Sequence, residues 1–197
     1  MKSILLCGVG GQGTILASKL IAQAAMSKGM EAKSAETIGM AQRGGSVVSH
    51  VRIGEEIHSP MIPLQMADVI IGFEPGEAVR ALSYLKEDGK MVVCPDSIQP
   101  VTASLGMGHY EGADCIEFLK SKVKNLVIVP GREICEKCGS PKVLNTALLG
   151  AAAGNVLGLS LKELEQAIGM LVKEKFQSMN QKALQLGAET ELEIERI

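Results

Sequence analysis

Short apolar runs recur along the first two thirds of the chain, each bounded by glycine, proline or polar residues. Such runs are typical of strands that are buried on both faces of a parallel sheet. They predict strands at residues 3–7, 67–73, 90–94 and 125–129, and we expect a further strand at 31–37.

Helical patterns occupy the intervals between these strands. Residues 14–28 predict a helix that Gly29 is suited to end. Further helices are expected at 75–86 and around 115–122. The order of strand, glycine-rich loop, helix and strand at the start of the chain is the opening of a doubly wound parallel sheet.

The middle of the chain departs from this repeat. Residues 46–53 and 56–59 are strand-like and flank a Gly-Glu pair, which predicts a β-hairpin. The two strands must be antiparallel, because parallel neighbours need a long crossover. His50 and Arg52 share one face of the first strand. We expect that face to be exposed or to lie at an interface.

The last third of the chain is predicted to be helical. Ser140 and Pro141 suit the start of a helix, and Ser160 with Glu163 matches a capping box. The uncharged stretch 143–161 approaches the length of a membrane span, but its polar residues and glycines argue against one. We expect a helix that is buried in the domain or faces a partner subunit.

These elements predict an α/β fold: a Rossmann-like mixed, mostly parallel sheet with an antiparallel hairpin, helices on both faces and a helical C-terminal third. We expect residues 1–197 to form one domain, with the sheet within 1–130 and mainly helices in 131–197. Gly150 and Gly154 are spaced so that another backbone could approach the uncharged stretch closely.

Charge and composition narrow the function. The net charge is −2, aromatic residues make up 3% and Trp is absent, so we expect neither nucleic acid nor a membrane as a partner. Cleavage of a signal peptide at the N-terminus would destroy the first glycine motif. The odd count of five cysteines favours free thiols in a reducing compartment, which indicates a cytoplasmic protein.

The first candidate site is the loop that follows the first strand. Gly8, Gly10 and Gly13 match the G-x-G-x-x-G pattern, with Gly11 and Gln12 between the last two glycines. Such glycines permit a tight turn and close approach of a phosphate to backbone N–H groups at the helix N-terminus. The same loop also occurs as a strand-to-helix turn without a ligand, and the pattern leaves both interpretations open.

A second candidate site comprises Gln42, Arg43, Gly44 and Gly45. A guanidinium, a side-chain amide and backbone amides on one loop could bind a phosphate, a carboxylate or the acidic surface of a partner. The alternative is a simple turn into the following strand.

Other reactive residue types form no recognisable site. Cys135 and Cys138 lack the further ligands that a zinc site or an iron–sulfur cluster requires, and the three histidines are far apart in sequence. We therefore assign no catalytic residue and no metal ligand.

Several segments together resemble the gamma-type subunits of 2-oxoacid:ferredoxin oxidoreductases. They are LLCGVGGQG at 5–13, ETIGMAQRGGSVVSHVR at 36–52, ADV at 67–69 and FEP at 73–75. The glycine loop combined with MAQRGG is far more specific than either motif alone. Within this family the chain most resembles the small (beta) subunit of indolepyruvate ferredoxin oxidoreductases.

The resemblance implies a subunit that is inactive alone and completes a complex that oxidatively decarboxylates a 2-oxoacid, such as indolepyruvate or pyruvate, to an acyl-CoA. Thiamine diphosphate, magnesium and iron–sulfur clusters are then expected on larger catalytic subunits, with ferredoxin reached through the complex. Coenzyme A is a candidate ligand of a groove shared by residues 8–13 and 42–45. The stoichiometry, and whether the isolated chain forms a homodimer, stay open.

Two alternatives compete with this interpretation. The first is a free-standing NAD(P)-binding protein, in which Glu36, near the end of the second predicted strand, would bind the ribose. The second is a non-catalytic interaction scaffold whose glycine loop holds no ligand.

Overall fold

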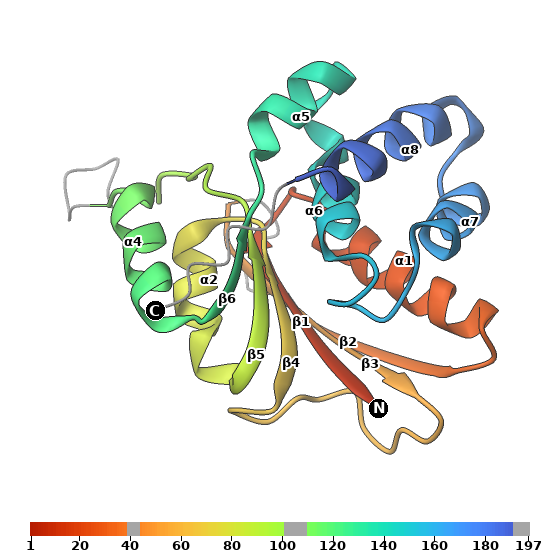
Figure 1. Ribbon diagram of the computed structural model, residues 1–197, viewed down its shortest axis with the longest axis horizontal. Coiled ribbons are helices and arrows are strands. Elements are labelled where there is room, and N and C mark those ends of the chain that lie inside the picture. Colours follow the sequence, from red (N-terminus) through yellow and green to blue (C-terminus); the bar gives the residue numbers. More distant parts are fainter. Residues whose placement is uncertain (39–43, 101–109, 191–197) are drawn as a thin grey trace.

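The computed structural model describes residues 1–38, 44–100 and 110–190 (Figure 1). Six strands form one sheet in the order β2-β3-β1-β4-β5-β6. Their bounds are β1 Lys2–Val9, β2 Glu31–Ile38, β3 Ser46–Gly54, β4 Ala67–Gly72, β5 Leu85–Val93 and β6 Asn125–Ile128. Strands β1, β4, β5 and β6 are parallel, and β3 runs antiparallel to both of its neighbours. The mixed, mostly parallel sheet predicted from the sequence is confirmed.

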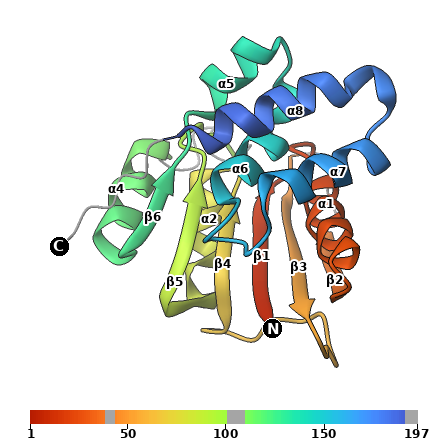
Figure 2. The ribbon, with the colours of Figure 1, turned by 45° about the vertical axis from the view of Figure 1, so that its right-hand side comes forward.

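Helices cover both faces of the sheet (Figure 2). α1 (Thr14–Ser27), α6 (Leu144–Ala152), α7 (Leu161–Leu171) and α8 (Glu174–Ala188) lie on one side, and α2 (Pro75–Ala81) and α4 (Gly112–Lys122) lie on the other. α5 (Gly131–Cys138) stands at the carboxyl ends of the parallel strands and packs against α6 and α8. Short 3₁₀ turns occupy η1 (Leu82–Tyr84) and η2 (Pro141–Val143).

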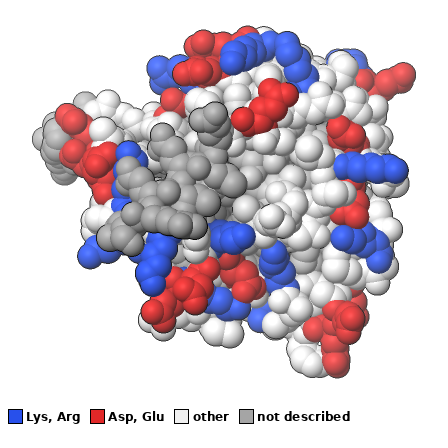
Figure 3. Space-filling view, viewed as in Figure 1, with Lys and Arg blue, Asp and Glu red and all other residues white. Residues whose placement is uncertain are grey.

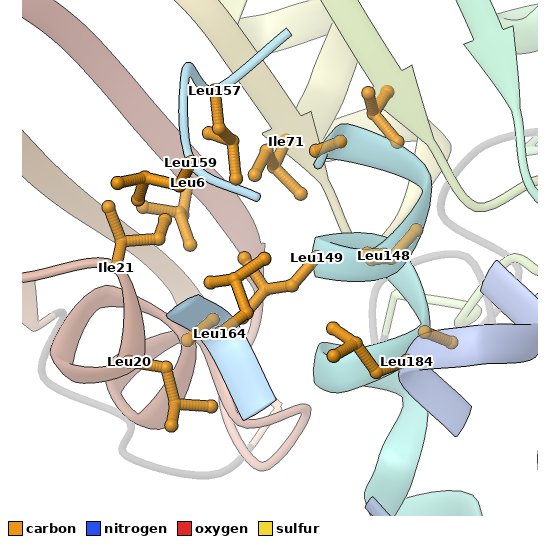
Figure 4. Close-up of a cluster of buried hydrophobic side chains, with 14 of the residues drawn as sticks. Leu6, Leu20, Ile21, Ile71, Leu148, Leu149, Leu157, Leu159, Leu164 and Leu184 are labelled. Carbon is orange, nitrogen blue, oxygen red and sulfur yellow. The ribbon is translucent and has the colours of Figure 1, made fainter. Parts of the chain in front are cut away.

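The central strand β1 is buried on both faces because its side chains alternate between two cores. Ile4 and Leu6 join the core beneath α1 and α6, whereas Leu5 and Cys7 join the core beneath α2 and α4. Figure 4 shows the larger core, to which Leu6 and leucines of α6, α7 and α8 all belong. Each fully buried leucine contributes roughly 1.5–3 kcal/mol, so the C-terminal helices are integral to the sheet's stability.

The antiparallel hairpin exists, but its partner strand differs from the prediction. β3 pairs with β2, which precedes it, and not with residues 56–59, which form no strand. The physical reason is that β2 and β1 already occupy both edges of β3. Residues 56–59 therefore have no free edge, and the backbone of Ile57 is held instead by the side chains of Glu31 and Lys33.

The expectation for His50 was also wrong, because this side chain is only 3% exposed. The backbone N–H of Ile62 donates to its Nδ1 over 3.2 Å, and the ring of Tyr84 lies edge-on with centroids 5.8 Å apart. Burial lowers the pKa of His50. Residues 59–62 form the segment that covers His50. Arg52 helps to hold this segment, since its guanidinium donates to the carbonyl of Ser59 over 3.1 Å.

The uncharged stretch forms a shorter helix than predicted, α6, which packs inside the protein. A Cβ on Gly150 would lie 1.9 Å from the carbonyl oxygen of Leu184, and one on Gly187 would lie 1.9 Å from that of Ala147. These two glycines therefore let α6 and α8 cross in backbone contact. Gly154 lies beyond the end of α6, with φ +71°, and takes no part in the crossing.

The capping box at the start of α7 is confirmed. Ser160 accepts from the backbone N–H of Glu163, whose carboxylate accepts from the N–H of Ser160 in return. In the described part of the chain, no helix combines the length and the apolar character needed to cross a bilayer.

Candidate functional site: the glycine-loop pocket

The two glycine-rich loops meet at the carboxyl end of the sheet. The N–H of Gly10 donates to the carbonyl of Gly45 over 2.8 Å, and the N–H of Gly44 donates back to the carbonyl of Gly10 over 3.4 Å. The two candidate loops are therefore neighbours. Gln42 and Arg43 lie outside the described residues, so their predicted role stays a prediction.

Gly8 and Gln12 shape the loop from within. A Cβ on Gly8 would lie 2.7 Å from Cβ of Phe73, so only glycine fits. The Gln12 amide accepts from the N–H of Val9 over 2.7 Å and donates to the carbonyl of Phe73 over 2.9 Å. Gln12 thus connects the ends of β1 and β4, a structural role that the sequence pattern did not reveal.

Helix α1 begins directly behind the loop with an open N-terminus. Gly13 occupies the cap position with φ +88° and provides no side-chain cap. A Cβ there would lie 3.0 Å from the amide nitrogen of Asn145, which is itself buried. Gly11 is exposed at φ +108°, with open space where a side chain would project. Helix N-termini leave N–H groups without intrahelical partners, and such helix ends favour anions.

A pocket of about 690 Å³ opens beside the loop. Its walls come from residues 10–12 of the loop, 96–98 after β5, α5, and residues 139–144 at the start of α6. The size lies within the range of small-molecule sites. The pocket sits outside the carboxyl ends of parallel strands, where ligands of open α/β sheets bind.

Asp96 and Arg132 are the charged pair of this pocket, and the sequence analysis missed both. Asp96 accepts from the backbone N–H of Arg132 over 2.7 Å and from the Cys94 thiol over 3.3 Å. The Arg132 Nε lies 3.6 Å from Asp96 Oδ1. Side chains of both charges gather over α5 at the top of Figure 3. The sequence signal that could have indicated them was their position, since Asp96 follows β5 and Arg132 follows β6, at the carboxyl ends of parallel strands.

The thiols near the pocket are poor nucleophiles. Burial raises the pKa of Cys94 to about 12 and that of Cys135 to about 11. Both are therefore protonated near neutral pH, and thiols react as thiolates. Cys138 is a half-buried free thiol one turn further along α5.

Two buried carboxylates, Glu74 and Glu77, line a smaller hollow of about 290 Å³ on the other side of the glycine loop. Glu74 caps α2 by accepting from the N–H of Glu77 over 2.9 Å, and it also accepts from the Tyr110 hydroxyl. Glu77 accepts from the Ser46 hydroxyl over 2.5 Å and pairs with Arg80. These acids are satisfied by the protein's own donors, so they hold β3, α2 and the segment before α4 together.

Glu36 does not occupy the position of a ribose-binding acid. It lies on β2, which β3 separates from β1, and it is not among the residues that line the pocket. Its carboxylate accepts from the Ser18 hydroxyl of α1 over 3.4 Å. The inserted antiparallel strand thus removes the geometry on which the NAD(P) interpretation depended.

Comparison with known proteins adds the family. The model of the pyruvate ferredoxin/flavodoxin oxidoreductase family matches residues 3–190. The chain belongs to this family. Subunit IorB of the indolepyruvate oxidoreductase of Archaeoglobus fulgidus is 38% identical over 187 residues, which cover 94% of this chain and 92% of that protein. IorB of Pyrococcus horikoshii is 32% identical over 195 residues, covering 98% and 96%.

The fold agrees with this membership. The gamma subunit of a keto/oxoacid ferredoxin oxidoreductase from Geobacter sulfurreducens matches with a TM-score of 0.71 at 25% identity, covering 96% of this chain and 98% of that one. The resemblance seen in the motifs is confirmed, and the chain is a gamma-type subunit of the pyruvate ferredoxin/flavodoxin oxidoreductase family.

Proposed function

We propose that this gamma-type subunit completes a 2-oxoacid:ferredoxin oxidoreductase that acts on indolepyruvate, and that it is inactive without larger catalytic subunits. The observation that carries the proposal is the match to two IorB subunits over nearly the whole length of both chains. The chemistry of the described residues supports it, because the pocket offers protonated thiols and an ion pair instead of a nucleophile with an adjacent base.

Coenzyme A is the ligand that we assign to the glycine-loop pocket, as the acceptor whose thiol receives the acyl group. The exposed backbone of Gly11 and the guanidinium of Arg132 suit its phosphates. Ile98, Pro141 and Leu144 supply an apolar wall for its pantetheine arm. This subunit would thus bind and orient coenzyme A, while the bond-making steps take place on the partner.

Thiamine diphosphate, magnesium and the iron–sulfur clusters are assigned to the larger subunits. All five cysteines of this chain are free thiols, and Cys7, Cys94 and Cys135 are buried. Across the described residues, no three metal-binding side chains gather at one point. A cluster therefore does not fit this part of the chain, and electrons would reach ferredoxin through the partner.

We also propose that residues 1–197 act as one gamma-type domain in the cytoplasm. The packing of α6 and α7 with α1 in a single core supports one domain. The odd count of five cysteines suits free thiols in a reducing compartment.

Anaerobic affinity purification of the chain from its native cells, followed by assays with several 2-oxoacids, coenzyme A and ferredoxin, tests the proposal. We expect a stoichiometric larger subunit that carries thiamine diphosphate and iron–sulfur clusters, and activity with indolepyruvate. A chain that purifies alone and shows no activity with 2-oxoacids would refute it.

Two variants of the purified complex test the assigned site. Gly10→Ala and Arg43→Gln should raise the KM for coenzyme A or weaken subunit assembly, because both loops would line the shared groove. Gly169→Ala and Lys162→Gln are matched controls on α7, distant from the pocket lining. If Gly10→Ala and Arg43→Gln behave like these controls, coenzyme A does not bind at these loops.

A further inference from the structure

Arg132 stands out among the residues that line the glycine-loop pocket. It is the only Lys or Arg in the described lining, where Asp96 and Glu136 are the acids. Its side chain is 71% exposed, and the glycine loop belongs to the same pocket. An anion bound there would therefore meet the guanidinium on α5 as well as the exposed backbone of Gly11.

The contact between Arg132 and Asp96 is loose enough to exchange. The Arg132 Nε lies 3.6 Å from Asp96 Oδ1, and exposed pairs of this kind contribute little to stability. The guanidinium can therefore turn toward a ligand without breaking a strong interaction. A phosphate, which accepts two parallel N–H bonds from guanidinium, would compete well for it.

Asp96 does not depend on the guanidinium. Its carboxylate keeps the backbone N–H of Arg132 at 2.7 Å and the Cys94 thiol at 3.3 Å. Departure of the guanidinium therefore leaves Asp96 hydrogen-bonded and α5 anchored at its first turn. The arrangement separates the structural role of the Arg132 main chain from the freedom of its side chain.

We propose that Arg132 is the phosphate-selecting residue of this pocket, releasing Asp96 to bind a phosphate group of the incoming ligand. The inference rests on the proposed binding of coenzyme A at the pocket and names the residue that distinguishes phosphorylated from unphosphorylated forms. Glu136 lies one helical turn further along α5 and opposes the anion. It limits binding to ligands whose phosphate reaches Arg132.

The test is isothermal titration of the full-length chain, and KM measurement in the complex, with coenzyme A, dephospho-coenzyme A and pantetheine. Arg132→Gln should weaken coenzyme A binding about tenfold or more, the usual effect of losing a charge-assisted hydrogen bond. Pantetheine binding should stay unchanged, because pantetheine carries no phosphate for Arg132 to bind. Arg132→Lys should recover part of the affinity, and Glu136→Gln should increase it.

Lys137→Gln is the matched control, because Lys137 lies on the same helix but outside the pocket lining. Equal affinities of wild type and Arg132→Gln for coenzyme A would overturn the role of Arg132 and leave the proposed function standing. Equal losses for pantetheine and coenzyme A would also overturn it, since they would indicate a damaged pocket. Failure of the wild-type chain and complex to bind coenzyme A would overturn both the inference and the assignment of this ligand.

Discussion

Two regions of this protein depend on glycine, and they use it in opposite ways. At the crossing of α6 and α8, Gly150 and Gly187 leave no room for a Cβ, because another backbone occupies that position. In the glycine loop, Gly11 faces open space beside the pocket. In the first region the protein's own backbone fills the space beside the glycines, whereas in the second the backbone is left accessible to a ligand.

The polar groups of the two regions follow the same division. Near the crossing, buried Asn180 accepts from the Thr146 hydroxyl over 3.2 Å and donates to the carbonyl of Phe176 over 2.8 Å. At the pocket, Arg132 reaches its acid only loosely and stays mostly exposed. The presence of a glycine or a charge therefore does not mark a site. What distinguishes a site is whether the surrounding chain already fills the space beside the glycine or already pairs the polar group.

The largest effect is expected at the crossing. Gly150→Ala places a methyl group where the carbonyl of Leu184 now lies, 1.9 Å away, so α6 and α8 must separate. We expect a loss of about 3 kcal/mol or more in the free energy of unfolding, measured by urea denaturation. Gly169→Ala on α7 is the control. Its added methyl meets nothing within 4 Å, so this variant should gain about 0.5–1 kcal/mol. If both variants change stability alike, the close crossing is absent in solution.

The same two regions show what the sequence could predict. Local patterns sufficed for β1, the glycine loop and the capping box at Ser160, because each depends on residues a few positions apart. The partner of β3 was beyond local reasoning, since the choice depended on which sheet edges were already occupied. The pocket was half predicted for a similar reason. Gly10 belongs to a motif, whereas Asp96 and Arg132 reach it only because parallel strands end at one edge.

A smaller effect is expected at the open region, where backbone conformation matters more than space. Gly11→Ala must adopt φ +108°, which costs a non-glycine residue about 1–2 kcal/mol. In the complex, its methyl group should also raise the KM for coenzyme A. Gly29→Ala is a strict control, because Gly29 has φ +77° with no neighbour within 4 Å and lies outside the pocket lining. Gly29→Ala should lose as much stability as Gly11→Ala but leave the KM for coenzyme A unchanged. The rise in KM in Gly11→Ala would then come from the pocket and not from backbone strain. Equal KM values for both variants would mean that the loop faces no ligand.

The smallest effect concerns His50, a polar group in a closed region. Burial lowers its pKa from the ordinary 6.5 in the folded protein, and its Nδ1 must be unprotonated to accept from the N–H of Ile62. The unfolded chain therefore binds the proton more readily. Stability should be complete above pH 6.5 and decline as the pH falls through that value toward the folded-state pKa.

Urea unfolding of the wild type and His50→Gln between pH 5 and 8 measures this slope. The variant should have a shallower decline below pH 6.5, because glutamine can still accept from Ile62 but does not titrate. His58→Gln is the matched substitution at a histidine whose side chain is 87% exposed. If the pH dependence of stability is the same in His50→Gln and in the wild type, His50 is not shielded from water in solution. The contrast between closed and open regions would then not extend to this end of the sheet.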